Sequence, residues 1–270
     1  MKSFRPSRAS LLAGLSFAAG VCTLLLPPTT AWAADDEPAA TPYRPSVAGG
    51  AYMSRPGWLD LELGAQRLGG KNTERRDSLP VLLKLALSEN WGLLLGGEAQ
   101  VCQVPGGASA VRGVGDTVAT LKVRLPYAAD GQALGVEASV KAPTAKDGLG
   151  SGKTDYGLKG IYSADLDSGL HLDANLGASR LGTADPAQSR TLVAWAAALS
   201  HPVGDAWSLV LDLSGSYQRG AASTRQLLSA ASYSVSKRMV VDAGLARGLS
   251  DASPKRTVFA GVTVLIGQIF

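Results

Sequence analysis

From about residue 58 to its end, the chain alternates between apolar and polar positions with a period of two. Leu59, Leu61 and Leu63 fall on one face of an extended chain, and Asp60 and Glu62 fall on the other. This alternation, about ten residues at a time, predicts β-strands rather than helices. We expect about twelve strands, over residues 59–66, 79–88, 93–101, 116–125, 134–141, 155–163, 170–177, 191–200, 207–216, 225–235, 239–246 and 258–270.

The segments between the predicted strands alternate in length. The longer ones are rich in Gly, Pro, Asp, Ser and Arg and cover 68–78, 102–115, 143–154, 181–190, 218–224 and 249–256. The shorter ones cover 88–90, 126–132, 165–168, 201–205 and 236–238. Long loops on one side, short periplasmic turns on the other and an even strand number are typical of bacterial outer-membrane barrels. The pattern therefore predicts an all-β fold, a transmembrane antiparallel up-and-down β-barrel of about 12 strands.

Between its first and last apolar residue, the apolar row of each predicted strand includes no charged residue, and the charged residues gather in the opposite rows. A Lys or Arg that faces lipid at mid-bilayer costs roughly 2–4 kcal/mol, so we expect the charged rows to face a lumen. The candidate pore-lining residues are Asp60, Glu62, Lys84, Glu98, Asp116, Lys122, Arg124, Glu137, Lys141, Asp155, Lys159, His171, Asp173, Asp212 and Asp242.

Aromatic residues gather near the short-turn ends of the strands, where an amphipathic ring suits the headgroup zone. Aromatics also favour strands in general, as Trp195 in mid-strand illustrates. The final strand ends on an aromatic residue and is expected to pair with the first strand and to be the segment that the barrel-assembly machinery recognises. The predicted interfacial belt is Trp58, Trp91, Tyr162, Trp207, Tyr233 and Phe270.

The amino terminus predicts export. Three basic residues precede an apolar stretch over 11–26, and Ala31-Trp32-Ala33 offers small residues for cleavage. The stretch is shorter than the roughly 20 residues of a spanning helix. We therefore expect a cleaved signal peptide over 1–33, a periplasmic amino-terminal segment over 34–57 and an outer-membrane barrel over 58–270.

The amino-acid composition limits which partners and which cross-links we expect for this chain. The chain has 26 basic and 22 acidic residues, and loss of Lys2, Arg5 and Arg8 with the signal leaves 23 basic ones. This near-neutral balance gives no reason to expect nucleic acid. Cys102 is the only cysteine after the signal, which excludes an intramolecular disulfide or a thiolate cluster. A sheet that closes on itself in a bilayer needs neither, because all its backbone groups are paired.

A soluble barrel or sandwich would show the same alternation with its apolar row pointing inwards. Soluble surfaces are about 25–35% charged, whereas this chain is 18% charged overall. The low charge favours the membrane barrel.

Two motifs resemble catalytic sites. The stretch 148–154 ends like a phosphate-binding loop, but Asp147 stands where a glycine is required, and a strand rather than a helix follows. His171 lies near Asp173, but no serine is placed to form a nucleophile pair with it. Histidine and cysteine spacing gives no metal site. We expect no enzymatic activity, no cofactor and no metal.

Several glycine-rich stretches follow one another in a characteristic order: Gly113-Val114-Gly115-Asp116-Thr117, Lys141-Ala142-Pro143-Thr144, residues 148–155, and Ala174-Asn175-Leu176-Gly177. This order resembles the bacterial outer-membrane transporter family called "Putative MetA-pathway of phenol degradation". The similarity covers most of the chain after the signal and is densest over 113–180. It implies a β-barrel channel for aromatic or other small organic compounds, and it brings no catalytic residues.

The sequence thus predicts an outer-membrane channel through which small organic solutes diffuse passively. The alternative is a non-transport barrel with a closed lumen and a structural or adhesion role. The expected partners are outer-membrane lipid, the barrel-assembly machinery and an unidentified small solute.

Overall fold

The computed structural model describes residues 38–70, 74–106, 109–126, 130–167 and 169–270. The predicted signal peptide lies outside these residues. No helix within the described ranges is long and apolar enough to cross a membrane.

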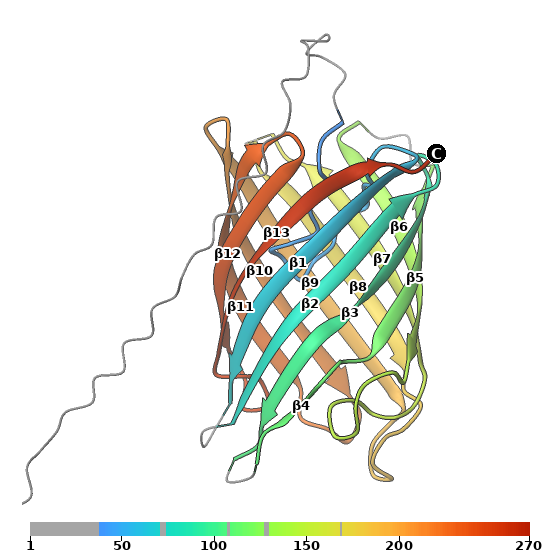
Figure 1. Cartoon of the computed structure of the whole chain (residues 1–270), viewed down its shortest axis with the longest axis vertical. Helices are drawn as coiled ribbons and strands as arrows, with labels where there is room; N and C mark the ends of the chain where they lie inside the picture. Colours follow the sequence, from blue (N-terminus) through green and yellow to red (C-terminus); the bar gives the residue numbers. More distant parts are fainter. Residues whose placement is uncertain (1–37, 71–73, 107–108, 127–129, 168) are drawn as a thin grey trace, which may run out of the picture. The chain divides into compact units, whose positions relative to one another are not determined.

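The described chain is built from antiparallel strands that follow one another around a ring (Figure 1). Except at the short β4, where β3 pairs with β5 instead, each strand pairs with its neighbours in sequence, and β1 also pairs with β13, which closes the ring. The short β4 pairs only with β3 and leaves twelve strands in the barrel wall. The strands are β1 (Trp58–Gly69), β2 (Arg75–Ala86), β3 (Trp91–Val104), β4 (Val111–Gly113), β5 (Thr117–Leu125), β6 (Gln132–Ala142), β7 (Asp155–Asp165), β8 (His171–Arg180), β9 (Thr191–Val203), β10 (Trp207–Gln218), β11 (Thr224–Ser236), β12 (Met239–Gly248) and β13 (Arg256–Gln268).

The closed twelve-stranded antiparallel barrel confirms the predicted fold class. Several strands extend beyond their apolar stretches, because polar residues at the rim continue the backbone pairing. β2 begins at Arg75, inside the predicted loop 68–78, and β4 lies inside the predicted loop 102–115. Connections 70–74 and 219–223 are consequently as short as some turns at the opposite end, so the alternation of loop length is weaker than predicted.

A β-bulge in β3 changes which side chains face the lumen. Leu79 pairs with Gln100, but the next residue, Pro80, pairs with Glu98, so Ala99 is the extra residue. An extra residue reverses the facing of all positions beyond it. Val101 is therefore fully buried, and its predicted place in the lipid-facing row is wrong.

The two rows of each strand differ sharply in exposure. Leu158 and Leu176 in the outer row are 60% and 64% exposed, whereas Asp60, Lys122 and Asp212 in the opposite row are 0% exposed. Apolar side chains on the outside and charged ones inside are the reverse of a soluble barrel. This arrangement supports the membrane-barrel interpretation.

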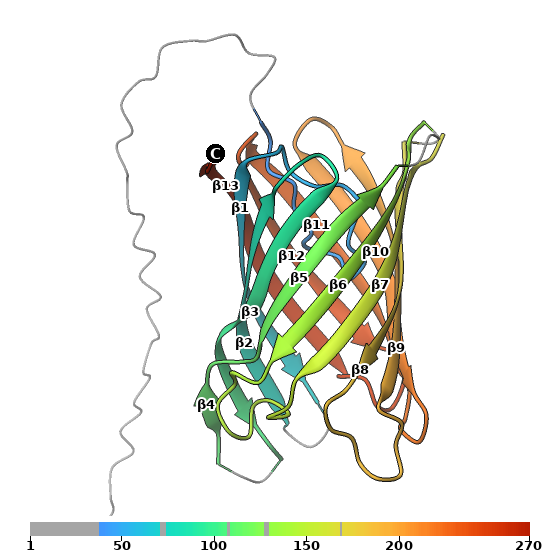
Figure 2. The same cartoon turned by 90° about the vertical axis from the view of Figure 1, so that its right-hand side faces the viewer.

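Residues 38–57 enter the barrel from its short-turn end and contact the inner wall (Figures 1 and 2). The sequence predicts a periplasmic segment over residues 34–57. The structure instead places residues 41–54 inside the barrel, against its inner wall. The physical reason is that the charges of the inner wall need partners, and this stretch supplies them.

Candidate functional site in the barrel lumen

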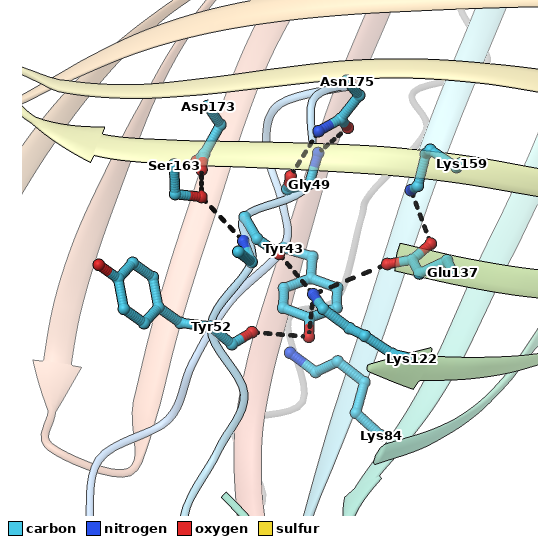
Figure 3. A network of polar contacts seen from close by, with 12 residues as sticks. Tyr43, Gly49, Tyr52, Lys84, Lys122, Glu137, Lys159, Ser163, Asp173 and Asn175 are labelled. Atoms are coloured by element: carbon cyan, nitrogen blue, oxygen red, sulfur yellow. Dashed lines mark hydrogen bonds and ion pairs between the residues drawn. The ribbon is translucent and has the colours of Figure 1, made fainter. Parts of the chain in front are cut away.

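The inner wall and residues 41–54, hereafter the lumen segment, form one polar network (Figure 3). The segment has no strand or helix of its own. Its backbone groups therefore bond to side chains of the wall, as buried backbone groups require. Its position depends on residues far away in the sequence.

Tyr43 is the centre of the network. Its ring lies between two lysine side chains, with Lys84 Nζ 4.2 Å and Lys122 Nζ 4.0 Å from the ring centroid. The Lys122 ammonium also donates to the Tyr43 hydroxyl at 2.7 Å, and that hydroxyl donates to the Tyr52 carbonyl at 3.0 Å. Burial and the neighbouring carboxylates, Glu137 first among them, raise the pKa of the Tyr43 phenol. The phenol therefore stays neutral and can act as donor and acceptor together.

Both lysines are neutralised by carboxylates of neighbouring strands. Lys84 lies 2.6 Å from Glu62 and 3.8 Å from Asp60, and it donates to the Thr41 carbonyl. Glu62 also accepts the Tyr43 N–H at 2.7 Å. A buried charge is tolerated only when it is paired in this way.

Glu137 links the next two lysines of the wall. It lies 3.6 Å from Lys122 and 2.7 Å from Lys159. Lys122 additionally donates to the Gly50 carbonyl of the lumen segment. β5, β6 and β7 thus hold one side of the segment through a chain of alternating charges.

Arg44 fixes the segment to the opposite strands. Its guanidinium donates to both oxygens of Asp242, at 3.1 and 3.0 Å. A Cβ on Gly64 or Gly261 would collide with that guanidinium, so the glycines of β1 and β13 provide the space that it occupies. A bidentate pair of this kind fixes orientation as well as charge.

Backbone amides of the lumen segment bind three wall side chains in turn. Asp212 accepts the N–H groups of Val47 and Ala48 at 3.0 and 2.9 Å. Asn175 accepts the Gly49 N–H at 2.7 Å and donates to the Gly49 carbonyl at 2.8 Å. Ser163 accepts the Ala51 N–H at 2.8 Å. These contacts position the part of the segment that crosses the lumen.

An aromatic and charged group lies where the lumen segment turns back towards β1. The Arg124 guanidinium stacks 4.9 Å from the Tyr52 ring, and the His171 ring lies 6.2 Å from it. His171 contacts Asp165 at 2.6 Å and Asp173 at 3.4 Å. Ser54 reaches Asp60 by a short hydrogen bond.

The remaining predicted residues lie away from the segment, towards the long-loop end. Arg76 pairs with Glu98. Lys141 lies 2.9 Å from both Asp116 and Asp155. Burial opposes ionisation of the Asp116 carboxyl, but hydrogen bonds from Lys141 and the Ala145 N–H outweigh it and lower its pKa. The predicted set therefore divides into residues that hold the segment and residues that fasten the outer loops.

Two cavities lie on either side of the lumen segment. One, of about 450 Å³, reaches from the segment towards the long loops, past Val47, Ser139, Ser214 and Gln226. The other, of about 370 Å³, lies between the segment and the wall at His171, Ser200, Ser208 and Ser232. Ala48 packs on Ala196 and Ala198 between them. This small apolar contact, together with the Asp212 hydrogen bonds, separates the cavities.

The wall that both cavities share differs chemically from the rest of the lumen. The inner row of β9–β12 consists mainly of alanine and hydroxyl residues. Its two carboxylates, Asp212 and Asp242, are bound by the lumen segment. A path along this wall would expose few free charges.

The predicted belt residues lie at the short-turn end. Trp207 and Tyr233 face each other across β10 and β11 with ring centroids 4.9 Å apart. The Arg238 guanidinium lies 5.5 Å from the Trp58 ring. Trp91 is exposed, the Tyr162 hydroxyl donates to Gln132, and Phe270, 63% exposed, lies just beyond the end of β13 at Gln268.

Sequence reasoning missed Tyr43, Arg44 and the backbone of 47–51, because the segment shows no periodicity. The sequence did contain a usable signal. Small residues at 48–51 follow the aromatic Tyr43 and the cation Arg44, and the predicted lumen rows carry many charges that require partners. Among the described residues, no three His, Cys, Asp or Glu side chains form a metal site.

The family called "Putative MetA-pathway of phenol degradation" matches residues 41–266. The chain belongs to this family. The resemblance seen in the sequence is thereby confirmed, and the match covers the whole lumen segment. No curated protein matches the chain.

Solved structures share the fold. An outer membrane channel from Pseudomonas putida F1 aligns with a TM-score of 0.64 and 15% identity, over 80% of this chain and 98% of that chain. The KdgM porin aligns with a TM-score of 0.55 and 9% identity, over 77% and 99%. The NanC porin aligns with a TM-score of 0.54 and 8% identity, over 77% and 100%. At these identities, the similarity establishes the barrel fold.

Proposed function

We propose that this protein is an outer-membrane channel for the passive passage of small, uncharged organic molecules, aromatic compounds among them. We further propose that the lumen segment gates it. The observation that carries the proposal is the pair of cavities separated by the Ala48 contact and the Asp212 hydrogen bonds. Displacement of that contact would join them into one path.

The chemistry of the path supports an uncharged solute. The hydroxyl residues of β9–β12 offer hydrogen bonds without fixed charge, and the alanines beside them are apolar. The lysines of the opposite wall are neutralised by Glu62 and Glu137. An ion would therefore lose water without gaining a partner. The family name, which refers to phenol degradation, supports aromatic compounds as part of the solute class.

The attachments of the segment support a gate. At 47–49 it is held by backbone hydrogen bonds to Asp212 and Asn175 and by the packing of Ala48, whereas Arg44 is held by a bidentate ion pair with Asp242. A net hydrogen bond contributes about 0.5–1.5 kcal/mol, or about 1.5–3 kcal/mol to a charged group. Residues 47–49 carry no charge of their own, so their displacement breaks these hydrogen bonds without separating an ion pair, and we propose that they are the part that moves.

The second candidate is a non-transport barrel with a structural role. The observation in its favour is the same segment, which fills the middle of the lumen. Conductance across planar bilayers distinguishes the two. We expect small, flickering conductance from the native chain and larger conductance from Asp212→Ala combined with Asn175→Ala.

Asp185→Ala is the matched control, because it removes one carboxylate from the loop 181–190 without touching the lumen segment. We expect it to conduct like the native chain. Absence of both conductance and entry of an uncharged solute, in the native chain and in the double variant alike and with both shown to be folded by heat-modifiable migration, would reject the channel and leave the structural role.

Liposome swelling tests the solute class. We expect glucose to enter faster than gluconate or glucosamine, which are similar in size and carry opposite charges. Phenyl glucoside should enter at least as fast as the smaller methyl glucoside. Rates that follow size alone would reject the aromatic preference, and faster entry of a charged sugar would reject the uncharged class.

A further inference from the structure

Arginines line the outer wall of the barrel at its long-loop end. On β13, Arg256 stands opposite Arg247 of β12 on one side and opposite Gly69 of β1 on the other. Gly69 in turn stands opposite Arg75 of β2. Arg67 lies on the same face of β1 as Gly69, one step closer to mid-strand. Arg112 of β4 stands opposite Cys102 of β3. All five arginines belong to outer rows by strand pairing. The long-loop ends of these strands are the lower ends in Figure 1.

The cluster has a large excess of positive charge. Asp77 pairs with Arg67 at 2.7 Å and with Arg75 at 3.1 Å, and Glu74 is a second nearby carboxylate. Within the described part of the chain, Arg112, Arg247 and Arg256 form no ion pair. Like charges directly opposite on neighbouring strands are destabilising. The Arg247–Arg256 pair therefore favours an anion from outside the chain.

The wall beneath the arginines is hollowed. A depression of about 650 Å³ is lined by Ala65, Leu79, Val258 and Ala260 on its apolar side and by Arg67, Arg75 and Arg112 on its charged side. A second depression of about 490 Å³ adjoins it at Arg256 and Lys255. The apolar part lies towards mid-strand and the charged part towards the rim. An acyl chain and a phosphate of one lipid would need this order.

We infer that this outer surface binds the phosphorylated disaccharide headgroup of lipid A, the glycolipid of the outer leaflet. Guanidinium groups bind phosphate oxygens with two parallel hydrogen bonds. Long loops mark the extracellular end of bacterial barrels, which places the cluster beside the outer leaflet. At the opposite end, the outer rows carry Trp91 and Trp207, which are exposed, instead of arginines.

The test compares two triple variants of the folded full-length barrel in detergent, with lipid A binding measured by native mass spectrometry. Arg112→Gln, Arg247→Gln and Arg256→Gln remove the unpaired cations and leave the Asp77 pairs intact. The matched control, Arg180→Gln, Arg190→Gln and Arg219→Gln, removes the same charge at the same end from β8 and the loops next to β9 and β10.

We expect the test triple to bind lipid A about tenfold more weakly and the control triple to bind within about twofold of the native chain. Dephosphorylated lipid A and phosphatidylglycerol should bind more weakly than lipid A, and millimolar inorganic phosphate should not displace it. Equal loss in both triples, equal binding of either comparison lipid, displacement by phosphate, or no binding would each overturn the inference.

The single variant Arg247→Gln guards against a folding defect in the triple variant. It relieves the Arg247–Arg256 repulsion and is therefore expected to fold at least as well as the native chain. It should still weaken lipid A binding measurably; unchanged binding contradicts the inference. The result is independent of the proposed channel, since the test triple should conduct normally in bilayers without lipid A.

Discussion

At the scale of single residues, Tyr43 shows how the lumen accommodates two buried lysines, Lys84 and Lys122, without destabilising the barrel. Its ring offers a face to Lys84 and to Lys122, and its hydroxyl accepts from Lys122. A desolvated cation over an aromatic ring contributes about 2 kcal/mol. The ring and the hydroxyl thus make separable contributions to holding the lumen segment.

Substitution of Tyr43 separates these contributions. Tyr43→Phe keeps the ring and loses the hydroxyl with its bond from the Lys122 ammonium, and we expect it to reduce protection of the lumen segment by about 1.5–3 kcal/mol. Tyr43→Leu loses both and should reduce it by about 2 kcal/mol more. Hydrogen exchange of residues 41–54 measures the effect. Equal exchange in the two variants would show that the ring contact contributes nothing.

At the scale of elements, the lumen segment behaves as an irregular chain held by the wall. Small residues on both sides allow the close approach: a Cβ added at Gly135 of β6 would lie 3.5 Å from the Cβ of Ala51. This separation suits a disulfide, in which the Cβ atoms are about 3.5–4.5 Å apart. The site thus permits a covalent test of gating.

Ala51→Cys with Gly135→Cys, in a Cys102→Ser background, should tether the segment to β6. We expect lower conductance from the oxidised protein than from the same protein after reduction, because the tether limits the movement of Val47 and Ala48. The Cys102→Ser chain alone is the control and should not respond to reductant. Equal conductance in both redox states would count against movement of the segment.

At the scale of the whole molecule, the barrel is stabilised by closure and by an outer surface that matches lipid. β1 and β13 pair along their full lengths, with one shift next to Leu59, so the barrel wall has no free edge. The charges on the outer rows are confined to the rim. The cost of an added charge should therefore depend on depth.

Leu176→Arg places a cation in the middle of the outer wall, and Thr191→Arg places one at the rim beside Arg180. We expect the first to lower the free energy of unfolding in phospholipid vesicles by about 2–4 kcal/mol and the second by at most about 1 kcal/mol. Urea titration measures both. Equal losses would mean that the outer wall does not face a hydrocarbon core.

The sequence by itself determined the strands, their number and the two rows of the wall, because each depends on a local period of two. It also contained the family resemblance, which the match over 41–266 confirmed. It placed Asp60, Lys122 and Asp212 in the buried row correctly. It misplaced Val101, because the bulge at Ala99 arises where Pro80 of β2 pairs with Glu98 of β3. The local pattern of β3 does not show this bulge.

Only the tertiary structure decided what fills the lumen. The bond from the Ala48 N–H to Asp212 spans 164 positions, and that from Gly49 to Asn175 spans 126. Contacts at such separations have no periodic trace in a single sequence. They arise because closure of the barrel brings its inner charges together, and those charges require partners that the segment at 41–54 supplies.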